Sequence, residues 1–121
     1  MRSETLGADA VEVSYSLGML ASDYLELKNL EKAYNLQIKA KAIRKEKLPP
    51  DHPKLADIYF NLSSTWLAMG DLEKAEQHIV RAYQIRLQIF GDDHYSVAAC
   101  RVNIAQIFLN DEKYQEAMTA I

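Results

Sequence analysis

The 121-residue sequence contains one cysteine, three prolines, four glycines and no long hydrophobic run. The single Cys100 cannot form an internal disulfide, and no second thiol is present to build a cysteine metal site. The four scattered glycines do not form a phosphate-binding loop. No apolar stretch approaches the roughly 20 residues of a membrane span, and the N-terminus lacks the apolar core of a signal peptide. We therefore expect a cytoplasmic protein with no cofactor, no metal ion and no membrane partner.

Charge is distributed unevenly along this sequence. The formal net charge of −3 gives no overall attraction for nucleic acid. Residues 28–54, however, carry eight basic and three acidic residues, a local net charge of +5. Five of these cations cluster near the end of a predicted helix: Lys39, Lys41, Arg44, Lys45 and Lys47. Two interpretations stay open, because cations stabilise the negative end of a helix dipole and the cluster would also serve as a docking patch for an acidic partner.

A repeat of 42 residues organises the rest of the chain. Shifting the sequence by one period aligns Asp9, Asp51 and Asp93; Leu20, Leu62 and Ile104; Leu25, Leu67 and Leu109; and Leu30, Leu72 and Tyr114. Another column contains Arg2, Arg44 and Arg86. A repeat of this length is one supersecondary unit that cannot bury its apolar side alone and must stack on its neighbours.

Apolar residues within each repeat recur at spacings of three and four, which predicts amphipathic helices. Asp9 is expected to cap the first helix. Pro49-Pro50 and Gly91 are expected to end two others, and turns are predicted at Lys28-Asn29, at Gly70-Asp71 and at 110–112. The predicted helices cover residues 9–27, 30–46, 53–69, 72–89 and 95–109, with another starting at Lys113, and no strand is expected.

Each unit also carries a shared pattern of small and aromatic residues. A small residue follows leucine or isoleucine, an aromatic residue lies three positions further on, and a leucine or tyrosine after the turn precedes an alanine by three. The matching residues are Leu20-Ala21, Leu62-Ser63 and Ile104-Ala105; Tyr24, Trp66 and Phe108; Ala33, Ala75 and Ala117; and Ala40 and Ala82. This pattern resembles the tetratricopeptide repeat. The long period is similar to that of kinesin light chains and of the sensor arrays of fungal and bacterial nucleotide-binding receptor proteins.

The resemblance implies an all-α fold, a right-handed superhelical solenoid of antiparallel helix hairpins with about two and a half repeat units. It implies a single domain over residues 1–121, with units at about 9–50, 51–92 and 93–121 and residues 1–8 as the tail of a preceding unit. Small residues are expected where the two helices of a hairpin approach closely, and Trp66 is expected to be largely buried between hairpins.

The resemblance also implies a concave groove lined by the first helix of each unit. Its expected lining is Asp57, Asn61, Ser64, Ala99, Asn103, Gln106 and Asn110, continued in unit one by Tyr15, Met19, Ser22 and Glu26. Asn61 and Asn103 lie one period apart, and an amide that donates and accepts is suited to the backbone of an extended peptide. We expect both side chains to be exposed on one surface. The alternative is that these asparagines only keep an exposed helix face soluble.

Three functions stay open from the sequence. The first is a protein–protein interaction module that binds a short peptide segment in the groove. The second is an architectural segment of a larger receptor or scaffold protein with no ligand of its own. The third is docking of an acidic partner on the cluster of residues 39–47. A clamp for a chaperone's C-terminal carboxylate is not favoured, because Lys54 and Asn61 lie seven residues apart rather than one turn.

An enzyme is not expected. His52 and His94 each follow an aspartate, but they lie one period apart in the predicted linkers, where a role in starting the helix explains them. His78 has no second candidate ligand at helical spacing.

The two ends of the sequence suggest a segment of a longer repeat protein. Residues 2–6 align with the ends of two later helices, as if the preceding part of their unit were missing. Near the other end, Tyr114, Ala117, Met118 and Ile121 would form an apolar helix face with no hairpin to cover it. Such a surface predicts self-association.

Overall fold

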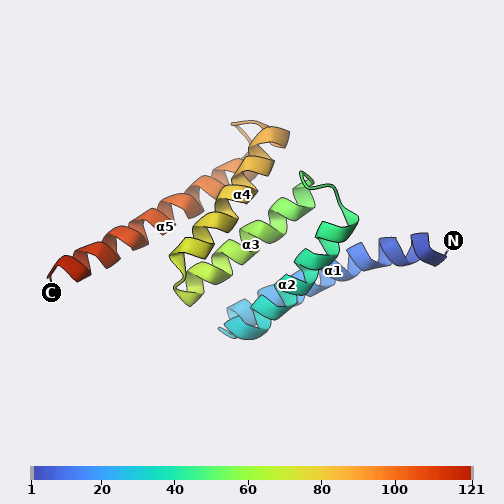
Figure 1. The fold of residues 1–121 in the computed structure, drawn as a ribbon, viewed down its shortest axis with the longest axis horizontal. Helices are drawn as coiled ribbons and strands as arrows, with labels where there is room; N and C mark the ends of the chain where they lie inside the picture. Colours follow the sequence, from blue (N-terminus) through green and yellow to red (C-terminus); the bar gives the residue numbers. More distant parts are fainter. Residues whose placement is uncertain (1, 121) are drawn as a thin grey trace.

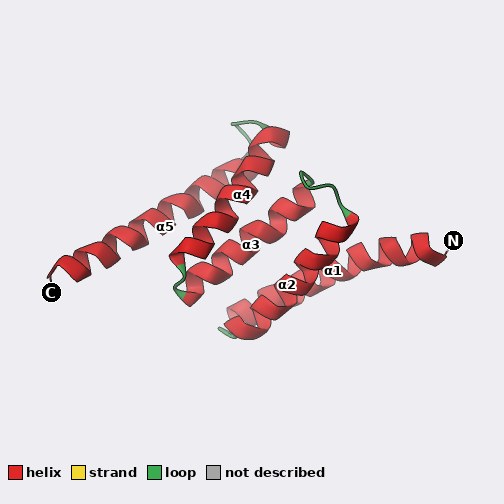
Figure 2. Cartoon of the chain, viewed as in Figure 1, coloured by secondary structure: helices red, strands yellow, loops and turns green. Residues whose placement is uncertain are grey.

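The computed structural model describes the backbone of residues 2–120 and the side chains of residues 10–112. Over this range the chain forms five helices and no strand (Figures 1 and 2). They are α1 (Arg2–Glu26), α2 (Leu30–Lys47), α3 (Pro53–Met69), α4 (Leu72–Phe90) and α5 (Tyr95–Ala120). The predicted all-α repeat solenoid is confirmed.

The helices pack in the order of the sequence. The pairs α1–α2 and α3–α4 form hairpins, and α2 packs on α3 just as α4 packs on α5. In Figure 1, α2 and α4 lie in front, and α1, α3 and α5 lie behind them. First helices therefore make one side of the solenoid and second helices the other. We call these the inner and the outer side.

Local residues explain where most helices begin. The side chain of His52 accepts a hydrogen bond from Lys54 N at 3.1 Å, and Asp71 accepts one from Lys74 N at 3.0 Å, so each caps the amides of a first turn. The turn before α4 uses Gly70 with φ 89°, and the turn before α2 uses Lys28 with φ 64°. The turns predicted at Lys28-Asn29 and Gly70-Asp71 are confirmed.

Two predicted helix boundaries are wrong. Helix α1 continues through Asp9, which is therefore not its N-cap, and α5 continues through 110–112, where a turn was expected. In the other units, the equivalent segments end a helix at Pro49-Pro50 or at Gly91, which has a positive φ. Near Asp9 the residue that most disfavours a helix is Gly7, which costs about 1 kcal/mol in a helix but does not stop one. Residues 110–112 include neither proline nor glycine.

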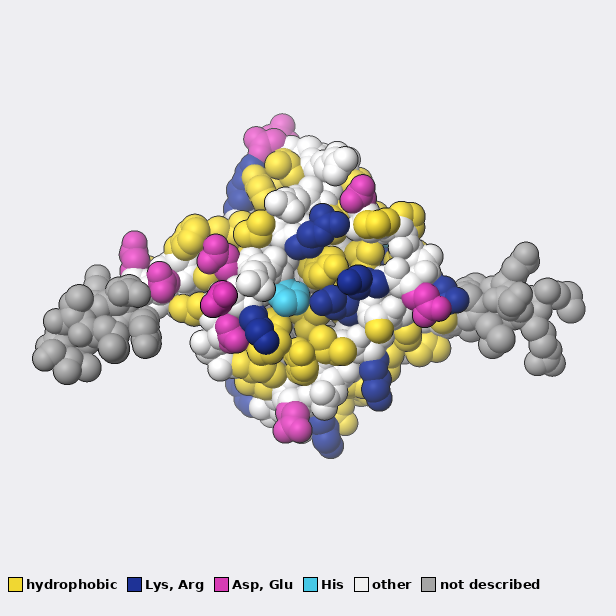
Figure 3. All heavy atoms as spheres, viewed as in Figure 1, with side chains coloured by type: hydrophobic (Ala, Val, Ile, Leu, Met, Phe, Trp, Pro, Cys, Tyr) yellow, Lys and Arg dark blue, Asp and Glu magenta, His cyan; other side chains and the backbone are white. Residues whose placement is uncertain are grey.

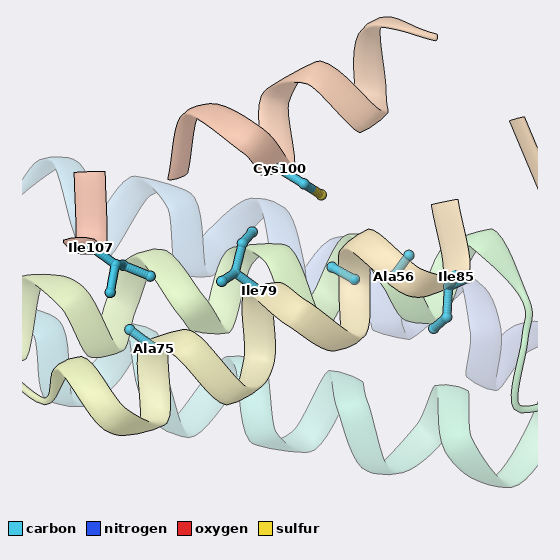
Figure 4. Packing of buried hydrophobic residues seen from close by; sticks show 7 residues of the cluster. Ala56, Ala75, Ile79, Ile85, Cys100 and Ile107 are labelled. Atoms are coloured by element: carbon cyan, nitrogen blue, oxygen red, sulfur yellow. The ribbon is translucent and has the colours of Figure 1, made fainter. Parts of the chain in front are cut away.

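The core lies where helices of the same and of successive hairpins meet. Small residues of the repeat are fully buried there, including Ala33, Ala75, Ala40 and Ala82, which permits close approach of the helix axes. One cluster joins α3, α4 and α5, and Figure 4 shows its members Ala56, Ile79, Ile85, Cys100 and Ile107. A second cluster joins α2 to α3 through Ala40, Leu55, Ile58 and Leu62.

Burial in this core depends on stacking between units. Leu62 is fully buried against α2, while Leu20, its equivalent one period earlier, is 45% exposed. Leu55 and its equivalent Val13 show the same contrast, at 2% and 49%. These residues are alike in type and register, so the neighbouring hairpin accounts for the difference in burial.

Trp66 lies where the two clusters meet and packs against both. Its ring is edge-on to Tyr34 of α2, with centroids 5.0 Å apart, and Lys74 Nζ lies 4.6 Å from its centroid. The side chain is partly buried between the hairpins, in keeping with the expectation, and it is not fully enclosed. Among the described residues, its buried Nε1 has no hydrogen-bond partner.

We expect Trp66→Ala to lower the free energy of unfolding by roughly 3 kcal/mol, near the lower end for large core truncations because the ring is only half-buried. Urea unfolding followed by circular dichroism measures the loss. The control Val102→Ala, at a 64% exposed position of α5, should stay within about 0.5 kcal/mol of the parent. A loss below about 1 kcal/mol for Trp66→Ala would show that the ring does not join the two clusters.

The N-cap of α3 gives a second stability test. His52→Ala removes the acceptor for Lys54 N and should cost about 1 kcal/mol, whereas His52→Asn supplies another good capping acceptor and should cost less. The same unfolding experiment compares the two variants. Equal losses would mean that capping is not what His52 contributes.

Candidate functional site

A groove of about 550 Å³ lies on the inner side between α1 and α3. Its lining residues are Tyr15, Gly18, Met19, Ser22, Arg44, Lys54, Asp57, Phe60, Asn61 and Arg86. Five positions expected on the concave surface lie together here, three from α1 and two from α3: Tyr15, Met19, Ser22, Asp57 and Asn61. The groove therefore spans the two hairpins, and its size suits part of an extended peptide.

The remaining predicted groove residues lie elsewhere. Asn103 is half-buried and donates from Nδ2 to Ser64 Oγ at 3.5 Å, so these two residues link α5 to α3. Ala99 and Asn110 are half-buried and Gln106 is exposed, and none of the three lines this groove. Asn61 is also half-buried, so both asparagines are less exposed than expected. Asn103 lies at a helix contact, where part of its surface is covered.

Arg44 was predicted as part of a surface patch, but the structure buries it, with 5% of its surface exposed. Its Nε donates to Ser14 Oγ at 3.0 Å, and its Nη1 donates to the backbone oxygen of Lys54 at 2.8 Å. The guanidinium carbon lies 4.8 Å from the ring centroid of Tyr15. Arg44 thus joins α2 to the first helices of both units.

Arg86 repeats this arrangement one period later and is 8% exposed. Its Nη1 donates to the backbone oxygen of Ser96 at 3.1 Å, and its Nη2 pairs with Asp57 Oδ1 at 3.0 Å. The guanidinium carbon lies 4.7 Å from the ring centroid of Phe60. The sequence did carry this information, since Arg44 and Arg86 share a column of the repeat. A cation that recurs at a fixed place in every unit indicates a shared structural contact.

The other members of the predicted basic patch do not form one surface with Arg44. Lys39, Lys45 and Lys47 are exposed, and Lys47 Nζ lies 3.9 Å from the carboxylate of Glu46. Lys41 is half-buried, with its Nζ 5.4 Å from the ring centroid of Tyr59. The prediction of a single five-residue patch is wrong, because neighbouring residues on a helix point in different directions.

Cations outnumber carboxylates in the groove. Arg44, Arg86 and Lys54 line it together with one acid, Asp57, and that acid pairs with Arg86. Burial lowers the pKa of Arg44, and the nearby charge of Asp57 opposes this shift. Lys54 Nζ lies over the ring of Tyr15, 4.8 Å from its centroid. The groove thus has a positive potential and aromatic walls, which favour a ligand with a carboxylate and an apolar side chain.

Cys100 is buried in the core beside Arg86, whose Nη1 lies 3.5 Å from Sγ. Burial raises the pKa of this thiol, although the charge of Arg86 opposes the shift. The environment is that of a core residue rather than a reactive thiol. Across the described residues, no group of three or more histidine, cysteine, aspartate and glutamate side chains could hold a metal ion.

Within the part of the chain that the structure describes, none of the helices is both long enough and apolar enough to cross a bilayer.

Comparison with known proteins identifies the family. A family model described as tetratricopeptide repeat matches residues 11–86 and 65–120. The chain therefore belongs to the tetratricopeptide repeat family, whose members are in general protein–protein interaction modules. No curated protein matches the chain.

Two solved structures with the same fold come from Podosopora anserina. Both are described as nearly identical TPR-like repeats of a kinesin light chain, and one is a single-residue variant of the other. Each is 22% identical to this chain and covers 88% of it, with TM-scores of 0.68 and 0.66. The chain spans 50% of each of those chains. The similarity to repeats of the kinesin-light-chain type is thus confirmed at the level of the fold.

The link formed by Arg86 can be tested through stability. Arg86→Gln removes a charge-assisted bond to Asp57 and a bond to the Ser96 carbonyl, and it should cost about 2 kcal/mol of unfolding free energy. The matched control Arg101→Gln breaks an exposed pair with Asp92 and should cost less than about 1 kcal/mol. Urea unfolding compares the two, and equal costs would show that burial of Arg86 adds nothing to stability.

Proposed function

We propose that this chain is a protein–protein interaction module that binds a short, extended peptide segment of a partner in the groove between α1 and α3. The observation that carries the proposal is the groove itself, about 550 Å³ in volume and lined by both units. The proposed ligand is peptide rather than nucleic acid, because the chain has a net charge of −3 and the groove is small.

The lining supports a mixed ligand. Asn61 and Ser22 offer donors and acceptors to a peptide backbone, while Tyr15, Phe60 and Met19 offer apolar contact. The excess of cations favours an acidic side chain next to an apolar anchor. Met19 is 72% exposed, so it is free to pack against such an anchor.

The architectural role stays the second candidate. It is favoured by the bonds of Arg44 and Arg86, since both arginines link successive units through backbone oxygens. On this alternative the groove cations serve stacking alone. Self-association through uncovered ends and a cytoplasmic location also stay predictions, as do the unit boundaries at about 50 and 92. The side chains of Tyr114, Ala117, Met118 and Ile121 lie outside the described residues.

A peptide selection tests the proposal. A phage-displayed library of random 12-residue peptides should yield ligands enriched in an acidic residue next to an aromatic or aliphatic one. Met19→Glu should weaken the selected peptides about tenfold or more, because its carboxylate would compete for the groove cations. The matched control Met69→Glu changes a residue outside the groove and should leave affinity unchanged. Titration calorimetry measures both variants.

Failure of the selection to enrich any sequence would contradict the groove proposal and favour the architectural role. The same conclusion would follow if Met19→Glu and Met69→Glu bound the selected peptides equally well.

A further inference from the structure

A second group of basic residues lies on the outer side of the solenoid, away from the groove. It consists of Lys41 and Lys45 of α2 and Lys74 and His78 of α4, which we call the outer cation cluster. Figure 3 views this side and shows lysine and arginine side chains around a histidine near its middle. The cluster replaces the patch predicted over residues 39–47, because it joins part of that patch to residues of the next unit.

Aromatic rings of α3 form the floor of the cluster. Lys41 Nζ lies 5.4 Å from the ring centroid of Tyr59, and Lys74 Nζ lies 4.6 Å from that of Trp66. The ring of His78 lies near both aromatic rings, with its centroid 6.1 Å from that of Tyr59 and 6.5 Å from that of Trp66. Two lysine ammonium groups and one imidazole therefore lie over or beside the rings of Tyr59 and Trp66.

The cluster lacks compensating negative charge among the described residues. No carboxylate there lies within 4.0 Å of the nitrogen atoms of Lys41, Lys45 or Lys74. Glu73 and Glu76, the acids of α4, are exposed and make no ion pair with these lysines. The nearby Arg81 differs, since its Nη2 lies 3.8 Å from the carboxylate of Asp51.

Each positive charge in the cluster makes protonation of its neighbours less favourable. Burial lowers the pKa of Lys41, and the charge of Lys45 lowers it further. Burial also lowers the pKa of His78; the charges of Lys41 and Lys74 act in the same direction, and a hydrogen bond from Nδ1 to the Lys74 carbonyl opposes them. The groups that face His78 are thus Lys41 of α2, Tyr59 and Trp66 of α3, and Lys74 of its own helix.

We propose that the outer cation cluster is a second docking surface, which binds an acidic segment of a partner protein. Carboxylates above Lys41 and Lys74 would supply the missing negative charge, and the half-buried rings would exclude water from the contact. A protein segment fits better than nucleic acid, because the cations are few, Glu73 and Glu76 flank them, and the chain is acidic overall. This inference does not depend on the groove.

Trp66 is the only tryptophan of the chain and lies within the surface, so its fluorescence reports binding directly. The probe is a synthetic peptide of eight alternating Asp and Glu residues, with an Asn/Gln peptide of the same length as control. We expect a saturable change in Trp66 emission with the acidic peptide only. The dissociation constant should rise steeply as NaCl increases from 50 to 300 mM.

Matched substitutions locate the binding. The double variant Lys41→Gln/Lys74→Gln should weaken binding about tenfold or more, and Lys41→Arg/Lys74→Arg should restore it because the charges return. Lys39→Gln, at an exposed position of α2 outside the cluster, and Lys54→Gln, in the groove, should leave binding unchanged. Circular dichroism of each variant confirms folding, and the arginine pair keeps the test decisive even where the glutamine pair unfolds.

The pH dependence gives an independent check. His78 is mainly neutral at pH 7 because its pKa is lowered, and a bound carboxylate would favour its protonated form. Binding should therefore strengthen as the pH falls from 8 to 6, and His78→Gln should flatten this dependence.

Three outcomes would overturn the proposal. In the first, Lys54→Gln abolishes binding and Lys41→Gln/Lys74→Gln does not, which would place the acidic peptide in the groove. In the second, single-stranded DNA or inorganic phosphate changes Trp66 emission at the same concentrations, which would indicate a general anion site. The third is the absence of any saturable change with the acidic peptide.

Discussion

Each hairpin of this chain has an apolar side that only its neighbour covers, and the rest of the structure depends on that stacking. Leu62 of α3 is buried because α2 packs against it, while its equivalent Leu20 is partly exposed. Buried apolar surface stabilises by about 25 cal/mol per Å². Because this surface lies between units, stability is distributed along the chain as contacts between nearest neighbours. The caps and turns determine where helices begin and end, but stacking holds them together.

Apolar contacts alone would tolerate some sliding of one hairpin on the next, and buried polar contacts fix the register. Gln37 of α2 is almost fully buried; its Nε2 donates to Asn61 O at 3.4 Å, and its Oε1 accepts from Thr65 Oγ1 at 2.7 Å. A slip of one residue would leave these groups unpaired, at a cost of about 1–3 kcal/mol each. The register in turn places Asn61 and Asp57 beside the groove.

The arginines connect stability with the candidate site. Arg44 and Arg86 hold successive units together through backbone oxygens, and the same guanidinium groups line the groove. Burial of a charge is costly unless hydrogen bonds and counter-charges accompany it. Here Asp57 is the one carboxylate that lines the groove, and it pairs with Arg86. The positive potential of the groove is therefore a consequence of how the units are joined. On the outer side, Trp66 also connects stability with a surface. It packs against both hydrophobic clusters of the core, and its ring lies beneath Lys74.

The amino-acid sequence alone was enough to predict the helical class, the repeat and most turns. These features depend on residues close together in the chain, such as apolar positions three and four apart, Gly70 with its positive φ, and Pro49-Pro50. The predicted boundaries at Asp9 and at 110–112 were wrong, because these segments lack the helix-ending residues that the equivalent segments of other units contain. Which side chains form the surfaces depended on the packing of the helices. Arg44 lies in a run of cations and looked exposed, yet atoms of Ser14 and Lys54, contributed by two other helices, bury it. A side chain's environment depends on residues distant in sequence, and local spacing does not contain that information.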